Sequence, residues 1–286
     1  AHLSGNTERA DAIALDDAMR GGLTGWGTDE GEVERVQNRV RDEVLARARS
    51  EGWSSQQMEA EVRRRMGRIS AEFETRYANV EEYRIPGREH EPALSRAFRS
   101  ELSGPERDLA QALQDNDLVA ADSARIEIER TGFYASDEKI NGVLRSQYER
   151  ALQARRLDEG PARGLAVEQA VRQARAEGKS EDEVSRIRMA MERQMETELG
   201  KAAQADSRLT MSQLQETYQD KYTWPLDFVV SWNTSGEDHA AARSLLAQGG
   251  RLEPIQELEY ATRGPGTDVD ALRRTFSTMT FAQVTA

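Results

Sequence analysis

Two glycine-containing segments of the chain have the residue types of an oxygen-donating loop. Residues 25–29 read Gly-Trp-Gly-Thr-Asp, and residues 264–268 read Gly-Pro-Gly-Thr-Asp. Because glycine has no Cβ, a loop that contains it can turn several backbone carbonyl oxygens towards one point. Hard cations such as calcium bind six to eight oxygens from carbonyls, carboxylates and water. Both segments are therefore candidates for cation binding.

Other motifs that could carry chemistry are weak or missing from the sequence. Residues 115–117, Asp-Asn-Asp, begin like an EF-hand loop, but no glycine follows at the sixth position. His2, His90 and His239 do not have the spacing of a metal site, and no cysteine is present to act as a nucleophile or zinc ligand. No P-loop, dinucleotide-binding or Gly-x-Ser-x-Gly motif occurs. The sequence therefore indicates no class of enzyme.

The composition favours a helical protein with an acidic surface. Only 7 of the 286 residues are proline, and no apolar run is long enough for a transmembrane helix. With 39 basic and 51 acidic residues, the formal net charge is −12. Such a surface repels nucleic acid and anionic lipid unless a local patch or a bound cation reverses the field. The basic run at 63–65 has Glu59 and Glu61 beside it, which favours a solvated helix face over a nucleic-acid site.

Apolar residues follow a helical period along almost the whole chain. Val33, Val36 and Val40 lie three and four residues apart, which predicts a helix with Thr28 as its N-cap. Residues 227–230, Asp-Phe-Val-Val, are the strongest candidate for a strand, but their context favours a helix. We therefore predict an all-α fold.

Several segments recur in a fixed order. Residues 15–30, 126–138 and 258–268 each combine the end of a helix, a loop containing glycine, and Thr-Asp or Ser-Asp. Residues 99–104, Arg-Ser-Glu-Leu-Ser-Gly, match residues 231–236, Ser-Trp-Asn-Thr-Ser-Gly, and both open an amphipathic helix. The order of loop, long helices, Ser-Gly turn and helix thus occurs twice and begins a third time.

These segments resemble the annexin family. The loops at 25–30 and 264–268 are similar to the first loop of an annexin repeat, and residues 100–104 are similar to the turn between its fourth and fifth helices. Residues 218–222, ahead of the turn at 234–236, resemble the third and fourth helices. The resemblance implies an annexin-like array of helical repeats, two complete and a third truncated.

The repeats of this chain are longer than those of the family. The aspartates at 29, 137 and 268 are 108 and 131 residues apart, which implies lengthened helices. The expected division is repeat 1 at 1–117, repeat 2 with a degenerate loop at 118–250, and the start of repeat 3 at 251–286. Because the third repeat would stop within its second helix, we expect the chain to be a fragment of a larger protein.

The resemblance implies a calcium site in the first repeat. An annexin site combines three loop carbonyls with one carboxylate from the distant turn. Carried over to this chain, the carbonyls belong to Leu23, Gly25 and Gly27, and the carboxylate belongs to Glu101. Ligand positions that the protein leaves free can take water or a lipid phosphate. The alternative interpretation is that the glycines only turn one helix into the next and that Glu101 is a solvated charge.

The other two repeats are expected to bind calcium less well. In the second repeat, Phe133 and Ala135 replace the loop glycines and Asn233 replaces the carboxylate, which predicts a structural role. In the third repeat, Gly264 and Gly266 are candidate ligands, but their carboxylate would lie beyond the end of the sequence.

Trp26 lies between the two glycines of the first loop and is a candidate membrane contact. An aromatic ring on a membrane-facing loop can settle at the level of the lipid headgroups. Packing of the ring on the preceding helix is the alternative.

The expected function is calcium-dependent, peripheral binding to anionic phospholipid membranes, with Ca²⁺ as the cofactor, no nucleic-acid partner and no catalysis. The alternative is a calcium-independent annexin-like helical scaffold or interaction domain within a larger protein. A homodimer through the truncated third repeat is a further possibility. The first two alternatives differ in whether the 21–27 loop and Glu101 converge on one oxygen-lined pocket.

Overall fold

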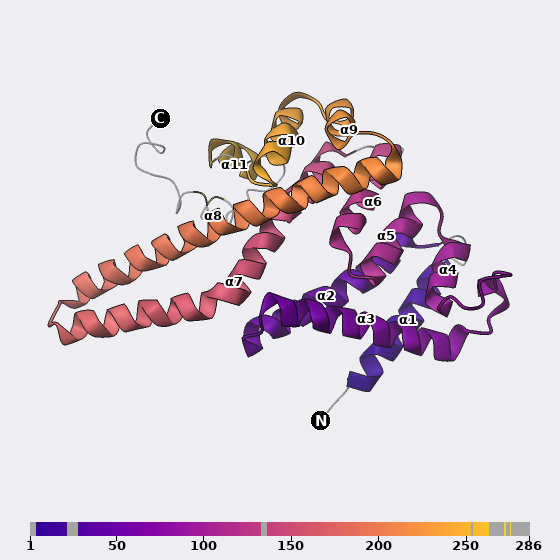
Figure 1. Cartoon of the computed structure of the whole chain (residues 1–286), viewed down its shortest axis with the longest axis horizontal. Coiled ribbons are helices and arrows are strands. Elements are labelled where there is room, and N and C mark those ends of the chain that lie inside the picture. The colour runs from indigo at the N-terminus through magenta and orange to yellow at the C-terminus, as the bar shows by residue number, and fades with distance from the viewer. Residues whose placement is uncertain are drawn as a thin grey trace. The chain divides into compact units, whose positions relative to one another are not determined.

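The computed structural model of the chain is all-α (Figure 1). It describes residues 4–21, 28–132, 136–252 and 254–262, together with Leu272 and Thr275. Every regular element in these ranges is helical, which confirms the predicted fold class. Within the same ranges, no helix is both long enough and apolar enough to cross a membrane.

The described α-helices range in length from 8 to 42 residues. The first six are α1 (Ser4–Met19), α2 (Glu30–Glu51), α3 (Ser55–Tyr77), α4 (Ala93–Glu101), α5 (Gly104–Gln114) and α6 (Leu118–Thr131), with a short 3-10 helix, η2 (Glu81–Tyr83), before α4. The remaining five are α7 (Asp137–Ala176), α8 (Glu181–Tyr222), α9 (Leu226–Asn233), α10 (Gly236–Gln248) and α11 (Pro254–Ala261).

The chain forms two compact units. Unit 1 comprises residues 1–135 and 216–224, and unit 2 comprises residues 136–215 and 225–286. The end of α8 therefore belongs to unit 1, where Tyr218 donates its hydroxyl to Glu127 at 2.6 Å. These last turns of α8 complete the packing around α6.

Local signals determine where α2 and α3 begin and end. Asp29 caps α2 by accepting a hydrogen bond from the Glu32 amide at 2.9 Å, so the prediction of Thr28 as the N-cap is wrong by one residue. The helix ends at Gly52, whose φ of 70° is a left-handed conformation that glycine adopts without steric cost. Ser54 and Gln57 then form a capping box at the start of α3.

The core of unit 1 lies between α1, α2 and α3. The helix α2 buries the predicted face, with Val33, Val36 and Val40 all almost inaccessible to solvent. The helix α3 buries Met58, Val62, Met66, Ile69 and Phe73, which are spaced three or four residues apart. Burial of each such side chain contributes about 1.5–3 kcal/mol, so the helical period accounts for most of the packing in this unit.

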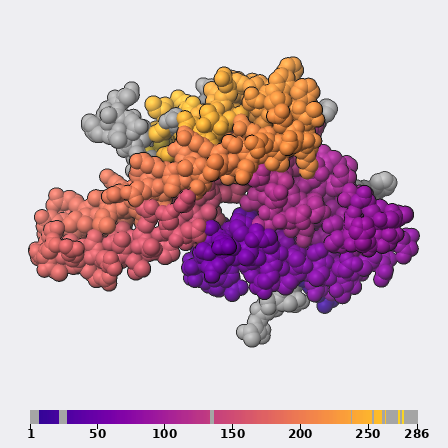
Figure 2. All heavy atoms as spheres, viewed as in Figure 1, coloured from indigo at the N-terminus to yellow at the C-terminus, as the bar shows by residue number. Residues whose placement is uncertain are grey.

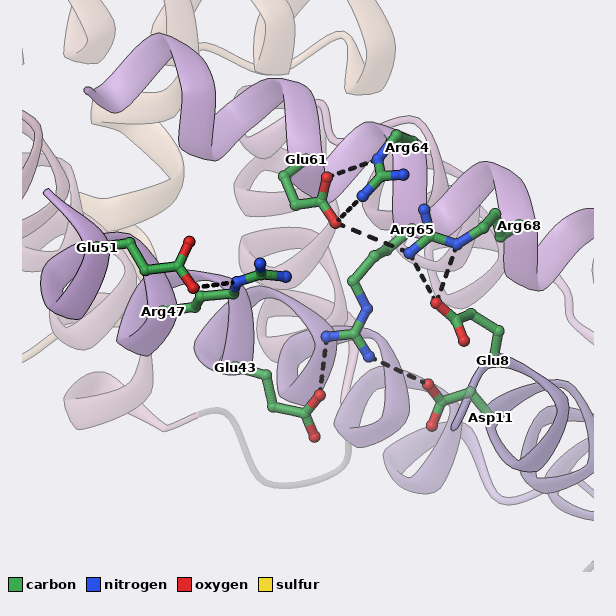
Figure 3. A network of polar contacts seen from close by, with 9 residues as sticks. All are labelled: Glu8, Asp11, Glu43, Arg47, Glu51, Glu61, Arg64, Arg65 and Arg68. Atoms are coloured by element: carbon green, nitrogen blue, oxygen red, sulfur yellow. Dashed lines mark hydrogen bonds and ion pairs between the residues drawn. The ribbon is translucent and has the colours of Figure 1, made fainter. Parts of the chain in front are cut away.

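A network of ion pairs connects the same three helices at the edge of this core (Figure 3). Arg65 of α3 lies 2.8 Å from Glu43 and 3.9 Å from Asp11, and its side chain is only 12% exposed. Arg68 lies 2.7 Å from Glu8. The prediction that the basic run at 63–65 is a solvated face is therefore wrong for Arg65, because neighbouring helices supply carboxylates that pair with it.

Unit 2 is built around the long helices α7 and α8, whose distal parts extend as a hairpin away from α9, α10 and α11 (Figures 1 and 2). Pro161 lies inside α7, where it lacks an amide hydrogen, and α7 bends along its length. Near the tip, Val171, Ala174 and Val184 form a small apolar cluster. Among the described residues, ion pairs between the two helices include Arg155–Asp206, Arg156–Glu196, Arg163–Glu198, Arg188–Glu168 and Arg175–Glu181.

The same order of five helices occurs twice in the chain. The helices α1 to α5 lie within residues 1–117 and α6 to α10 within 118–250, and α11 follows. The turn before the fifth helix has the same backbone in both cases, with φ of 50° at Gly104 and 53° at Gly236. The compact units do not follow this division, because α6 packs on α5 in unit 1.

Candidate functional site

The turn between α4 and α5 lies beside the end of the first loop. The hydroxyl oxygen of Thr28 is 3.0 Å from the backbone oxygen of Glu101 and 3.3 Å from that of Met19. The amide of Asp29 donates to the backbone oxygen of Ala18 at 2.9 Å, and the amide of Gly21 donates to the same oxygen at 3.3 Å. Both ends of the 22–27 loop are therefore held at the end of α1, next to Glu101.

The carboxylate of Glu101 is available for a cation. It is partly exposed, and it accepts a hydrogen bond from the hydroxyl of Ser100 at 3.1 Å. Among the residues with described positions, no basic side chain lies within ion-pair distance of it. Most other carboxylates near α1 are paired with arginines, such as Asp16 with Arg20 at 3.0 Å.

The remaining predicted site residues fall outside the described ranges. They are Leu23, Gly25, Trp26 and Gly27 in the first loop and Gly264 and Gly266 in the third. The structure thus brings together Glu101 and the two ends of the first loop, while the carbonyls predicted to bind the ion are not described. No group of three or more acidic or histidine side chains gathers as a metal site in the described ranges. A site made of loop carbonyls and one carboxylate does not require such a group.

The corresponding turn in unit 2 uses its polar groups internally. Asn233, at the position of Glu101, donates its side-chain amide to the backbone oxygen of Val229 at 2.8 Å. The carboxylate of Asp137 accepts hydrogen bonds from the amide of Ser235 at 3.2 Å and from its hydroxyl at 3.5 Å. Phe133 and Ala135 lie outside the described residues. In unit 2 the turn therefore also lies beside a residue that follows the loop, Asp137, and both Asp137 and Asn233 form hydrogen bonds within the protein.

A buried tyrosine, which the sequence did not reveal, holds the end of α1, the helix that precedes the first loop. Tyr83 donates its hydroxyl to Asp16 at 2.7 Å, and Arg20 lies both beside Asp16 and over the tyrosine ring. Burial and the hydrogen bond to Asp16 raise the pKa of Tyr83 far above its usual range, so it remains a neutral donor. Asp16 and Arg20 are one helical turn apart, so the sequence could have indicated their ion pair. It could not have indicated the contact with Tyr83, because Tyr83 is distant in the sequence.

The same arrangement recurs at the end of α6. Tyr218 donates to Glu127, and Glu127 also pairs with Arg130 on the next turn. Burial and the bond to Glu127 raise the pKa of Tyr218 in the same way. A tyrosine, a carboxylate and an arginine therefore fix the end of the helix that precedes each of the first two loops.

No protein-family model matches the sequence, and no curated protein is significantly similar to it. The residues of the chain itself are therefore the basis for assigning a function.

Proposed function

We propose that the chain binds anionic phospholipid membranes in a calcium-dependent manner, through the 22–27 loop and Glu101, and that it is not an enzyme. The observation that carries this proposal is the hydrogen bond between Thr28 and the backbone of Glu101. It joins two segments 73 residues apart in the sequence, both of which were selected for their oxygen donors. The resemblance of both segments to annexins supports the same assignment.

The residues fit a calcium ion better than a transition metal. Backbone carbonyls and one carboxylate are hard oxygen donors, which suit calcium. Glu101 would hold the ion from the turn, and the carbonyls of Leu23, Gly25 and Gly27 would hold it from the loop. Calcium would supply positive charge beside Glu101, with which no basic side chain of the described residues forms an ion pair.

The charge of the protein explains why the ion would be required. At a net charge of −12, the chain is repelled by an anionic bilayer. A calcium ion that shares its ligands between the protein and a lipid phosphate replaces this repulsion by attraction. Binding should therefore be negligible in chelator and appear when calcium is added.

The test is co-sedimentation of the chain with vesicles that contain phosphatidylserine. Glu101→Gln keeps the shape of the side chain but removes its charge, so the calcium concentration at half-binding should rise at least tenfold. Glu82→Gln removes an exposed carboxylate of η2 and serves as the matched control. Thr28→Val, which removes the hydroxyl that holds the loop to the turn, should also weaken calcium binding. A normal calcium requirement for Glu101→Gln would contradict the assignment of this ligand.

The alternative function is a calcium-independent helical scaffold with annexin-like repeats. It is favoured at unit 2, where Asn233 replaces the carboxylate and donates its amide within the protein, and where Asp137 accepts hydrogen bonds from Ser235. Equal sedimentation in calcium and in chelator, or none in either, would favour this alternative.

A further inference from the structure

The helix α9 of unit 2 has an exposed aromatic face. Leu226, Val229 and Val230 are buried on one side of the helix, whereas Phe228 is 47% exposed and Trp232 is 78% exposed. The two aromatic residues are four positions apart, so they lie one above the other on the same face. Their rings are stacked with centroids 6.0 Å apart. They therefore form one continuous apolar surface.

The sequence around this face contains almost no charge. Asp227 is the only charged residue between positions 223 and 236, although 31% of the whole chain is charged. Ser231 and Ser235, also exposed, have small neutral side chains. A surface of aromatic rings and small neutral groups can enter the headgroup region of a bilayer without the large cost of dehydrating ions.

The size of the face favours a lipid surface over a protein partner. A large aromatic side chain buries about 150–250 Å², so the exposed parts of the two rings amount to roughly 200–300 Å². A stable protein interface buries about 800 Å² on each partner. A membrane contact requires less area, because a few aromatic rings at the level of the headgroups already provide anchoring.

The counterpart helix of unit 1 does not have this face. Eight and four residues before its turn glycine, α4 carries Arg96 and Ser100, and Arg96 is buried. Immediately after Ser100 comes Glu101, the proposed calcium ligand, whereas Trp232 is followed by Asn233. The unit that lacks the calcium carboxylate is thus the one that has the aromatic pair.

We propose that α9 is a hydrophobic membrane anchor whose residues Phe228 and Trp232 insert among the headgroups of a phospholipid surface. The proposal deepens the proposed function, on which it rests for the choice of partner, by adding a contact that needs no calcium ligand. Insertion of the rings adds apolar burial to the free energy with which the chain binds the membrane.

Vesicle co-sedimentation of the whole chain tests the contribution of this face. The double variant Phe228→Ser/Trp232→Ser should bind phosphatidylserine vesicles in calcium at least about tenfold more weakly, since burial of even one large aromatic side chain is worth that factor. Leu165→Ser, which removes an exposed leucine of α7, is the matched control and should bind within twofold of the unmodified chain. Equal binding by the double variant and the control would overturn the proposal.

Tryptophan fluorescence then separates the anchor from the calcium site. In the triple variant Trp26→Phe/Trp53→Phe/Trp224→Phe, Trp232 is the single tryptophan. Its emission should shift to the blue and be quenched by lipids with brominated acyl chains. Calcium-dependent binding without quenching would overturn the anchor but would still support the calcium site. Equal quenching in chelator would support the anchor and overturn the calcium requirement. Absence of vesicle binding in every condition overturns both. A dimer in gel filtration that the double variant abolishes, without quenching by lipid, would show that the face pairs two copies and would overturn the anchor.

Discussion

Replacement of Gly250 by alanine should be among the most damaging single substitutions in unit 2. Gly249 and Gly250 follow the end of α10 with φ values of 71° and 88°. A Cβ at Gly250 would lie 2.4 Å from the backbone oxygen of Leu144 and 3.0 Å from the amide nitrogen of Tyr148, both in α7. Because a helix backbone cannot yield locally, the end of α10 would have to move away from α7.

The expected cost has two parts. Alanine in a left-handed conformation costs roughly 1–2 kcal/mol relative to glycine. Movement of α10 also uncovers the apolar contact between the helices, where Leu144 and Leu245 are fully buried. Loss of burial for one such side chain costs about 1.5–3 kcal/mol. Together these give about 3–5 kcal/mol, which is large for a single substitution.

A series of glycines separates the two contributions. Gly178 has a similar φ of 78°, but a Cβ there would meet no described atom within 4 Å, so Gly178→Ala should cost only the backbone part of about 1–2 kcal/mol. Gly249→Ala would bring a Cβ to 2.7 Å from the amide nitrogen of Arg208 and should resemble Gly250→Ala. Urea unfolding followed by circular dichroism measures all three. If Gly250→Ala were no worse than Gly178→Ala, the close packing of α10 on α7 would be refuted.

Two further predictions concern pH and salt. Burial by itself would raise the pKa of Glu59, but the hydrogen bonds from Arg41 and Asn116 and the positive charge of Arg41 outweigh it and lower the pKa below its ordinary value of 4.5. Glu59 therefore contributes stability above about pH 4.5, and this stability is lost as the pH falls through the folded-state pKa. The variant Glu59→Gln should flatten the dependence of the urea midpoint on pH between about 3 and 6. An identical acid dependence in both proteins would contradict this origin. At 1 M salt, where the Debye length is about 3 Å, the ion pairs between α7 and α8 should weaken. Amide exchange should then accelerate in the distal hairpin but not beside α10, and unchanged exchange would show that the apolar cluster alone holds the hairpin.

The sequence by itself determined the helices, because their signals are local. The spacing of Val33, Val36 and Val40 predicted the buried face of α2, and Gly52 and Ser54 marked the boundary with α3. Residues 227–230 were also correctly predicted to be helical, now as part of α9. Each of these features depends on residues within a few positions of one another, so the order of residues is sufficient to predict them.

The candidate site was only half determined by the sequence. The types of residue in the 25–29 segment and at Glu101 indicated oxygen donors, whereas only the resemblance to annexins implied that the two segments meet. The contact between Thr28 and Glu101 spans 73 positions and exists only in the folded chain. The hydroxyl of Thr28 takes part in this contact, while Asp29 caps α2.

The tertiary structure alone decided which side chains face solvent and which form hydrogen bonds within the protein. The replacement of the carboxylate by Asn233 predicted a structural role, but only the structure shows that the side-chain amide donates to the backbone oxygen of Val229 in α9. By its residue type, Trp232 would be expected in the core, because large aromatic side chains are highly buried on average. In the structure it is the most exposed large apolar side chain on α9. Exposure depends on what distant segments cover, and the order of residues along the chain does not specify it.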